Sequence, residues 1–456
     1  MNNKVFLRRM LWLLCLPLLL TACKDSMDEH YEVPDWVADN AWEVLSSGEH
    51  GNYSIFLQGL EIAGYKQMLE GKAILTIIAP DDDAFQTYLN KRGFTSISDM
   101  PVNEVSKLIG YHVLYYSYNK EKLVNFRPTG STETEEEQNI KAGLYYKHRT
   151  RSSDAPTVET TPTGASVMVY HLERYLPIFS YRYFQTKGID AKNNYEAFYP
   201  NSTWTGDDGF NVSNASVKEY GIIANNGYIH AVDRVVEPLE TIYTELKNKE
   251  KYSTFLDLYD SFGVYVADDE LSKLYAKAYG VDTLYQYQHG GLPNIACEWP
   301  TSSYLNFTAL TALSYSIFAP SNTAINSFFD SFWKIGGYSS MQEVDALALN
   351  YFLYQFIYGG SMLFPEELGD DELKNLAGSS LNINPAALNE KTMCVNGALY
   401  GMDEIKEPST FASVIGPLFQ YKSARSFLYA LLGSSLFSSY VSDLSKYIVL
   451  VPTAEQ

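Results

Sequence analysis

A short phrase in this chain returns with all its intervals preserved. The two copies contain the same residue types in the same order, namely Asn226, Gly227, Asp233, Glu237 and Pro238, and Asn396, Gly397, Asp403, Glu407 and Pro408. Apolar runs that end in Pro accompany them at 77–80 and 317–320, and a third such run begins at 449. A repeat with so long a period predicts tandem domains and not a solenoid. Because no catalytic group recurs with the phrase, we expect a binding protein and not an enzyme.

Domain boundaries follow from aligning the copies. We assign 1–22 to a signal peptide, 23–40 to an acidic leader, 41–240 to a first domain, 241–412 to a second domain, and 413–456 to the start of a truncated third domain.

Two insertions interrupt the alignment. In the first domain, the interval between Tyr111 and Asn226 is longer than its counterpart in the second, which places an insertion at about 127–218. In the second domain, the interval between the opening motif and the Pro-terminated run is the longer one, which places an insertion at about 266–312. The first insertion begins with an acidic run and a Ser/Thr/Pro-rich stretch, which are typical of exposed, mobile chain. Long insertions are often functional, so we expect both to contact partners.

The N-terminus combines basic residues with a short apolar run. Residues 10–20 are almost entirely apolar but too few for a membrane-spanning helix, which needs about 20 residues, so they indicate a signal peptide. The run ends in Leu-Thr-Ala-Cys at 20–23, which resembles the lipobox of bacterial lipoproteins and implies cleavage before Cys23 and lipidation of its thiol. The acidic residues that follow resemble the export tag of Bacteroidetes surface lipoproteins. We therefore expect an outer-membrane protein that faces the cell exterior and has only a lipid anchor.

Charge and cysteine content restrict the partners and cofactors. Removal of the predicted signal peptide leaves 31 basic and 54 acidic residues, a net charge of −23. Nucleic-acid binding requires clustered Lys and Arg, so nucleic acid is not expected as a partner. Cys297 and Cys394 could form one disulfide in an oxidising compartment, and two buried free thiols are the alternative. No zinc-type Cys/His cluster or cofactor motif occurs in the sequence, so we expect no metal and no cofactor.

Local patterns predict several secondary-structure elements. The apolar runs at 75–79 and 314–319 end in Pro and predict strands. Residues 81–89 begin with acidic cap residues and continue with helical spacing, and 102–113 predict a helix that leads into a strand. The Asn-Gly pairs at 226 and 396 are expected to form hairpin turns, because both residue types tolerate positive φ.

Three motifs make the first domain similar to the fasciclin family. The segment from Thr76 to Asp81 resembles the first box of that family, and Tyr111-His112 matches its central motif. The segment from Asn226 to Pro238 matches its closing box, and the order and intervals of the three motifs also fit. The second domain departs from the pattern, because Phe and Tyr stand at 352 and 400 where the first domain has histidines.

The resemblance implies both a fold and a general role. The implied fold is α+β, with tandem domains that are each a β-sandwich-like wedge with several packed helices. The implied role is cell-surface adhesion or protein–protein binding, without catalytic residues and without a cofactor. The residues assigned to structural motifs are Tyr111, His112, Asn226, Gly227, His230, Asp233, Asn396, Gly397 and Asp403.

The chemistry of these residues favours structural roles. His112 and His230 lie in apolar patterns, where a neutral imidazole most often satisfies backbone groups; metal binding or acid–base catalysis is the less favoured alternative. Asp233 and Asp403 follow the Asn-Gly pairs and are expected to accept backbone N–H bonds.

Two functional hypotheses remain in different classes. The favoured one is adhesion through binding of a surface or matrix protein, with the insertions as contact regions. The alternative is glycan capture within a polysaccharide-utilisation system, together with an outer-membrane transporter complex. In that case exposed aromatic side chains would stack on sugar rings, and the candidates are Tyr181, Tyr183, Trp204 and Trp299. An enzyme hosted by the insertions is the weakest hypothesis, since no nucleophile–base pair can be assembled from the sequence.

Overall fold

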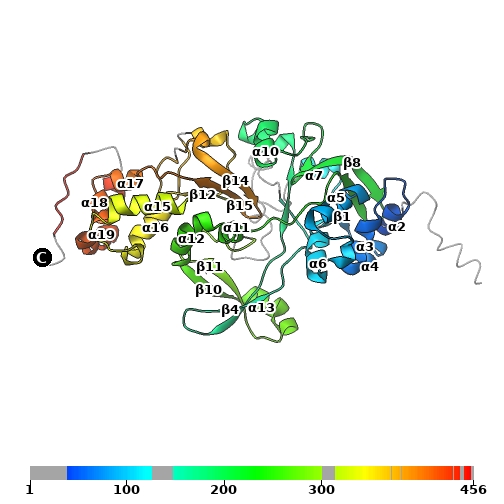
Figure 1. Ribbon diagram of the computed structural model, residues 1–456, viewed down its shortest axis with the longest axis horizontal. Helices are drawn as coiled ribbons and strands as arrows, with labels where there is room; N and C mark the ends of the chain where they lie inside the picture. Colours follow the sequence, from blue (N-terminus) through cyan, green and yellow to red (C-terminus); the bar gives the residue numbers. More distant parts are fainter. Residues whose placement is uncertain are drawn as a thin grey trace, which may run out of the picture.

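The computed structural model describes residues 39–125, 147–299, 314–370, 372–381, 383–434, 436–441 and 446–452. The predicted signal peptide, Cys23 and the acidic run at 133–137 lie outside these residues. Within the described ranges, no helix has the length and apolar character needed to cross a membrane. Below, the first unit means the described residues up to 240 and the second unit those from 241. In Figure 1, helices α2 to α6, within 41–111, lie at the right end and α15 to α19, within 322–432, at the left end, and elements of both units lie between them.

The first unit is organised around two parallel central strands. β1 (Leu75–Pro80) pairs in parallel with β9 (Gly227–Val232), and β2 (Val113–Tyr115) and β8 (Ala215–Ala224) flank this pair in antiparallel orientation. Every residue of β1 is buried, as its continuous apolar run predicted. Burial of each aliphatic side chain stabilises the fold by about 1.5–3 kcal/mol.

The second unit repeats this sheet strand by strand. β12 (Tyr315–Pro320) pairs in parallel with β15 (Gly397–Met402), and β13 (Ile357–Gly359) and β14 (Leu388–Cys394) flank them. Both the strand order and the strand directions match those of β2, β1, β9 and β8. The internal repeat in the sequence is therefore a repeat of one four-stranded sheet, and the predicted tandem arrangement is confirmed.

Helices cover the sheets of both units. In the first unit they are α2 (Ala41–Ser46), α3 (Ser54–Ile62), α4 (Lys66–Glu70), α5 (Asp82–Arg92), the 3₁₀ turn η1 (Ile97–Asp99), α6 (Val102–Tyr111) and α7 (Lys120–Val124). In the second unit the regular helices are α11 (Ile242–Lys247), α12 (Ser253–Asp260), α15 (Asn322–Phe328) and α16 (Ala346–Tyr354). Its short turns are η3 (Glu250–Tyr252), the π-turn η5 (Phe329–Trp333), η6 (Met341–Glu343), η7 (Glu367–Gly369) and η8 (Pro385–Ala387). Asp81 accepts the amide of Ala84 at 2.9 Å and so caps α5, in agreement with the predicted helix start.

The segment assigned to a third domain packs on the second unit. The predicted second domain ends with α17 (Ser409–Ala412), and the segment after it contains α18 (Gly416–Gln420), η9 (Lys422–Ala424), α19 (Arg425–Leu432) and α20 (Phe437–Val441). Phe411, Phe419 and Leu428 are buried in the core of the second unit. The third domain itself stays a prediction.

The first insertion widens the sheet of the first unit. Its described part contributes β3 (Lys147–Arg149), β4 (Thr157–Thr160), β5 (Ser166–Val169), β6 (Tyr175–Phe179), α9 (Tyr181–Lys187), α10 (Ala191–Phe198) and β7 (Asn211–Val212). The sheet then has seven strands in the order β2-β1-β9-β8-β7-β6-β3.

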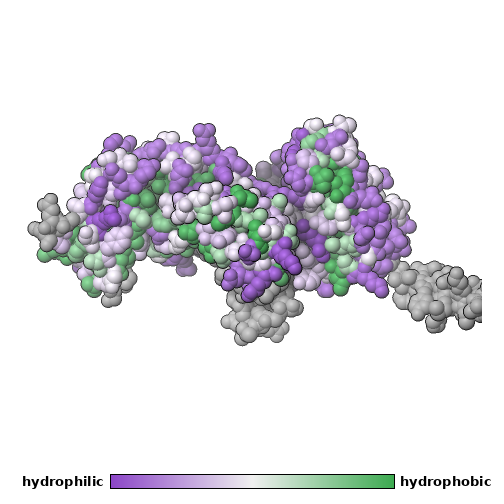
Figure 2. Space-filling view, turned by 90° about the horizontal axis from the view of Figure 1, so that it is seen from below, coloured by the Kyte–Doolittle hydropathy of each residue, from purple (hydrophilic) through white to green (hydrophobic). Residues whose placement is uncertain are grey.

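The two insertions meet in a second sheet that neither could build alone. The second insertion supplies β10 (Gly263–Asp268), α13 (Asp269–Tyr275), η4 (Ala276–Tyr279) and β11 (Leu284–His289). β11 pairs in parallel with β5, which gives a four-stranded sheet in the order β10-β11-β5-β4. This shared sheet projects from the lower side of the molecule in Figure 1. Figure 2 views that side and shows hydrophilic and apolar residues interspersed.

The two described parts of the first insertion differ in exposure: β4, in the Ser/Thr/Pro-rich stretch, is exposed as predicted, whereas the aromatic segment that follows is buried. Phe179, Phe184 and Tyr195 are at most 1% exposed and belong to the core of the second unit. The rings of Phe184 and Phe364 lie 5.0 Å apart between centroids. The aromatic side chains of this segment therefore fill the neighbouring unit and do not face solvent.

The hairpins predicted at the Asn-Gly pairs are confirmed, but each two-residue turn lies one residue earlier than the pair. The two turn residues before β9 are Asn225 and Asn226, and neither Asn226 nor Asn396 has a positive φ. Gly227 is needed for a different reason, because a Cβ there would lie 1.9 Å from the carbonyl oxygen of Leu75 in β1. A Cβ at Gly397 would lie equally close to the carbonyl oxygen of Tyr315 in β12. The glycines therefore permit the parallel strands to approach closely.

The asparagine side chains join each sheet to its first helix. The buried Asn226 accepts the amide of Ala41 at 3.0 Å and donates to the carbonyl oxygens of Leu69 and Gly71 at 2.8 and 3.0 Å. Asn396 makes the same three bonds in the second unit, with Ile242, Ile295 and Cys297 at 3.0, 2.8 and 3.0 Å.

Replacing Asn226 by Ala should therefore lower the free energy of unfolding by about 2–4 kcal/mol, because one buried amide and two carbonyl groups lose their partner. Chemical denaturation measures this directly. The exposed neighbour provides a control, since Asn225→Ala should change the free energy by less than about 0.5 kcal/mol. Equal effects of the two substitutions would contradict the structural role of Asn226.

Candidate functional site

A cavity of about 510 Å³ lies where the two insertions meet. One wall is the shared sheet, which contributes Thr157, Val169, Tyr265 and Tyr287. The register explains why these side chains share a face, because Tyr265 lies opposite Tyr287 and Thr157 lies opposite Val169. Helix α11 faces this wall, and the loops before and after α11 contribute further lining residues.

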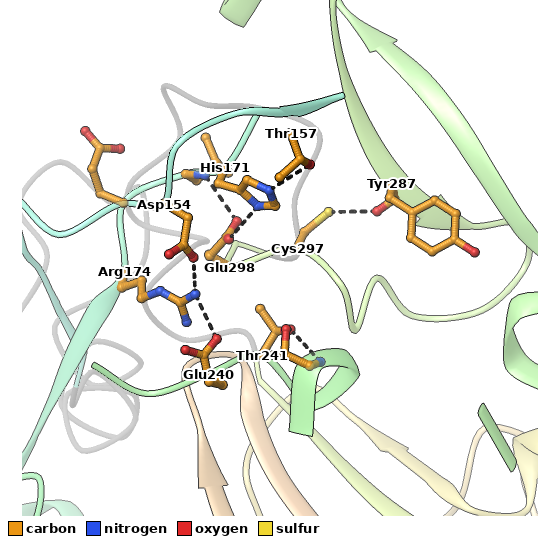
Figure 3. Close-up of polar contacts among 12 residues, drawn as sticks. Asp154, Thr157, His171, Arg174, Glu240, Thr241, Tyr287, Cys297 and Glu298 are labelled. Atoms are coloured by element: carbon orange, nitrogen blue, oxygen red, sulfur yellow. Dashed lines mark hydrogen bonds and ion pairs between the residues drawn. The ribbon is translucent and has the colours of Figure 1, made fainter. Parts of the chain in front are cut away.

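An ionic cluster around one buried arginine lines part of the cavity. Arg174 is 2% exposed and binds the carboxylates of Asp154 and Glu240, the latter at 2.9 Å. Lys107 contacts the same two carboxylates at 2.7 and 3.0 Å, so the two cations and the two anions balance. Figure 3 shows Arg174 reaching from the first insertion to both acids.

Burial and charge act in opposite directions within this cluster. Burial alone would raise the pKa of Asp154, but Arg174 and Lys107 outweigh it and hold the pKa at about 2. Burial alone would lower the pKa of Arg174, whereas the neighbouring carboxylates raise it. Asp154 and Arg174 are therefore both ionised at neutral pH, and their ion pair fixes the position of the two side chains at the cavity.

A second polar contact links the two insertions directly. The carboxylate of Glu298, 4% exposed, lies 3.3 Å from Nδ1 of His171 and accepts the amide of Leu172 at 3.1 Å. The other ring nitrogen of His171 lies 3.4 Å from the hydroxyl of Thr157. Burial would lower the pKa of His171, but its bond to Glu298 dominates and raises it. The contact is therefore strongest when the imidazole is protonated.

The opposite end of the cavity is aromatic. The hydroxyls of Tyr243 and Tyr287 donate to the carboxylate of Asp260 at 3.2 and 2.9 Å. Nε2 of the buried His289 lies 3.2 Å from the same carboxylate. These bonds orient the two phenol rings toward the cavity, whose lining also includes Tyr170 and Tyr265.

This arrangement is suited to binding. The charged side chains at the Arg174 end are paired with one another, so they hold fixed positions around the cavity. Within the described residues, no group of three His, Cys, Asp or Glu side chains is placed to hold a metal ion.

Comparison with known proteins bears on the framework around the cavity. A fasciclin domain model matches residues 51–177. Residues 51–177 are therefore similar in sequence to a fasciclin domain. A solved fasciclin domain pair, from the insect cell adhesion molecule Fasciclin I, aligns with 80% of this chain and 96% of its own length. That alignment has 12% identity and a TM-score of 0.23. No curated protein matches the chain.

The two fasciclin-motif histidines lie away from the cavity and bond to the backbone. His112 is buried; its Nδ1 lies 3.0 Å from the oxygen of Leu108, and its Nε2 accepts the amide of Val236 at 3.0 Å. His230 accepts the amide of Gly221 at 3.1 Å on Nδ1, and its Nε2 lies 3.0 Å from a carbonyl oxygen. Burial lowers the pKa of both imidazoles to about 4, so they are neutral at pH 7.

The other motif residues also serve the framework. Tyr111 donates from its buried hydroxyl to the carbonyl oxygen of Tyr175 at 2.9 Å. Asp233 accepts the amide of Ser216 at 2.8 Å, as expected. Asp403 differs, because it forms an exposed ion pair with Lys251 at 2.9 Å.

The two remaining cysteines are buried free thiols, so the disulfide alternative is not formed. Cys297 lies at the cavity and donates to the carbonyl oxygen of Tyr287 at 3.3 Å, whereas Cys394 lies 3.8 Å from that of Thr392. Burial raises the pKa of both thiols, so neither is reactive at neutral pH.

Two of the four proposed glycan contacts are inaccessible. Trp299 is fully buried, and its indole donates to the carbonyl oxygen of Glu173 at 2.6 Å, while Tyr183 is 4% exposed within the second core. The prediction was wrong for both, because they pack between the units. Tyr181 is 39% exposed, and the half-buried Trp204 donates to a carboxylate at 2.7 Å.

Apart from Cys297, no cavity residue was among the candidate site residues predicted from the sequence. Arg174, Glu240 and Glu298 are far apart in the sequence and belong to no motif, and only the folded chain brings them to one cavity. The alternation of Tyr285, Tyr287 and His289 is the signal that could have identified β11 as a strand with an aromatic face.

The contact between His171 and Glu298 predicts a pH dependence of stability. Since the pKa of His171 is raised in the folded state, its contribution is complete below the unfolded value of 6.5 and disappears as the pH rises through the folded value. The unsubstituted chain should therefore have a higher free energy of unfolding than the His171→Gln variant, and the difference should be larger at about pH 6 than at about pH 8.5. Denaturation of both proteins at the two pH values measures this, and a constant difference would refute the proposed coupling.

Proposed function

We propose that this chain is a non-catalytic lipoprotein, anchored in the outer membrane through Cys23 and facing the cell exterior, that mediates adhesion by binding another surface or matrix protein. The fasciclin domain supports a binding role, and the lipobox-like segment at 20–23 supports the anchor. The acidic surface disfavours nucleic acid as a partner and favours a protein with a basic contact face.

The observation that carries this proposal is the projecting shared sheet. Its two outer strands expose aliphatic side chains on the face opposite the cavity: Val158 is 67% exposed, Val264 43% and Val266 39%. These valines alternate with the cavity residues along β4 and β10, as the two-residue period of a strand requires. An exposed β surface with aliphatic side chains suits contact with another protein.

Glycan capture alongside an outer-membrane transporter complex is the second candidate. The amide of Tyr181 donates to the carbonyl oxygen of Gly206 at 2.9 Å, which brings Tyr181 near the loop that carries Trp204. These two surface aromatics support a sugar-stacking site. Tyr183 and Trp299, the other two predicted contacts, are buried and cannot take part in it.

Crosslinking on intact cells tests the proposal. We expect the chain to capture a surface or matrix protein, and Val158→Asp should reduce the yield several-fold because it places a charge in the contact face. Ile335→Asp is the matched control, since Ile335 is 63% exposed but lies outside the shared sheet. Co-purification with only a transporter and its glycan-binding lipoprotein would favour the glycan alternative. Reproducible turnover of glycans or peptides would contradict the non-catalytic assignment.

A further inference from the structure

Three tyrosines form an open corner of the cavity where the two insertions meet, which we call the junction cavity. Tyr243 comes from α11, and Tyr265 and Tyr287 come from neighbouring strands. The ring centroids of Tyr243 and Tyr287 are 5.6 Å apart with planes inclined by 65°, and those of Tyr265 and Tyr287 are 5.0 Å apart with planes inclined by 46°. Rings inclined in this way present faces from several directions, which is the geometry that holds a cation against aromatic surfaces.

Carboxylates behind and beside the rings strengthen this property. Asp260 accepts bonds from the hydroxyls of Tyr243 and Tyr287, and a phenol that donates to a carboxylate has a more electron-rich ring. Burial is the main cause that raises the pKa of both phenols, with the negative charge of Asp260 adding to it, so they stay neutral. Glu159, on β4, also lines the cavity and is close enough to influence Tyr243 and Tyr265 electrostatically.

The charge balance leaves this corner available to a cation. Lys107 and Arg174 are neutralised at the other end of the cavity, whereas Glu159 is exposed and has no ion pair among the described residues. Lys247 lies at the rim and is the one lining cation outside that cluster in the described part of the chain. No described lysine or arginine stacks on Tyr243, Tyr265 or Tyr287.

We propose that the junction cavity binds an alkylammonium group, with its charge against Tyr243, Tyr265 and Tyr287 and Glu159 as the counter-charge. The volume of about 510 Å³ lies in the roughly 300–1,000 Å³ range of small-ligand sites. The group could belong to a lysine side chain of a peptide or to a small quaternary amine. The site does not depend on the adhesion role, because it requires only that the two insertions pair.

Calorimetric titration of the mature chain tests this site with two probes, choline and Nα-acetyl-lysine N-methylamide, which keeps its side-chain ammonium. The neutral isostere 3,3-dimethylbutanol serves as the control ligand, and it should bind at least about 10-fold more weakly because it lacks the charge. Tighter binding of the lysine derivative would identify a peptide as the source, and tighter binding of choline would identify a small amine. Either outcome supports the site.

Paired substitutions assign the binding to the aromatic corner. Tyr265→Leu should weaken binding about 10-fold because it removes a ring face, whereas Tyr265→Phe retains the face and should weaken it by less than about 3-fold. Glu159→Gln should weaken binding several-fold and reduce its dependence on salt.

Three results would overturn the proposal. They are no binding of either ammonium probe up to about 10 mM, equal binding of the neutral isostere, and unchanged binding by Tyr265→Leu. Circular dichroism of the variants confirms that they are folded, so a loss of binding reports on the site.

Discussion

The architecture depends on the burial of the first insertion in the second unit. Phe179 and Phe184 are fully buried there against Phe364, and each aromatic pair adds about 0.5–1.5 kcal/mol beyond the area it buries. Next to them, Lys187 reaches Glu367 at 2.8 Å and is almost completely covered. Because aromatic side chains of the first insertion are part of the core of the second unit, we expect the two units to behave as one body and not as a pair of flexibly linked modules. The shared sheet and its cavity exist only as a consequence of that union.

The repeated framework tolerates substitution wherever packing and hydrogen bonding can be satisfied in another way. Phe352 takes the place of a motif histidine and is fully buried in the second core. Tyr400 takes the place of the other and donates to the carbonyl oxygen of Leu363 at 2.6 Å. The asparagines at 226 and 396 are different, because each accepts an amide of the first helix of its unit and donates to two carbonyl oxygens of a later segment. The closing motif is thus the part of the repeat that ties sheet to helices.

Local sequence patterns were sufficient for the framework and insufficient for the junction. The strands at 75–80 and 315–320, the helix after Asp81 and the insertion positions followed from apolar runs, capping residues and intervals, which act over short distances. The pairing of β5 with β11 joins residues that are far apart in the chain, and only one face of each strand shows a pattern. Trp299 and Tyr183 were misassigned for the same reason, since their burial depends on a neighbouring unit that local sequence does not reveal.

Hydrogen exchange at the junction tests the central claim most directly. The amide of Tyr170 donates to the carbonyl oxygen of Tyr285 at 2.9 Å, across the two insertions. In the intact mature chain, this amide should be protected to a degree similar to the amides of β9 in the central sheet, because both lie in paired strands of one body. Exchange as fast as that of the exposed strand β4 would contradict the account and would mean that the two units are not joined in solution.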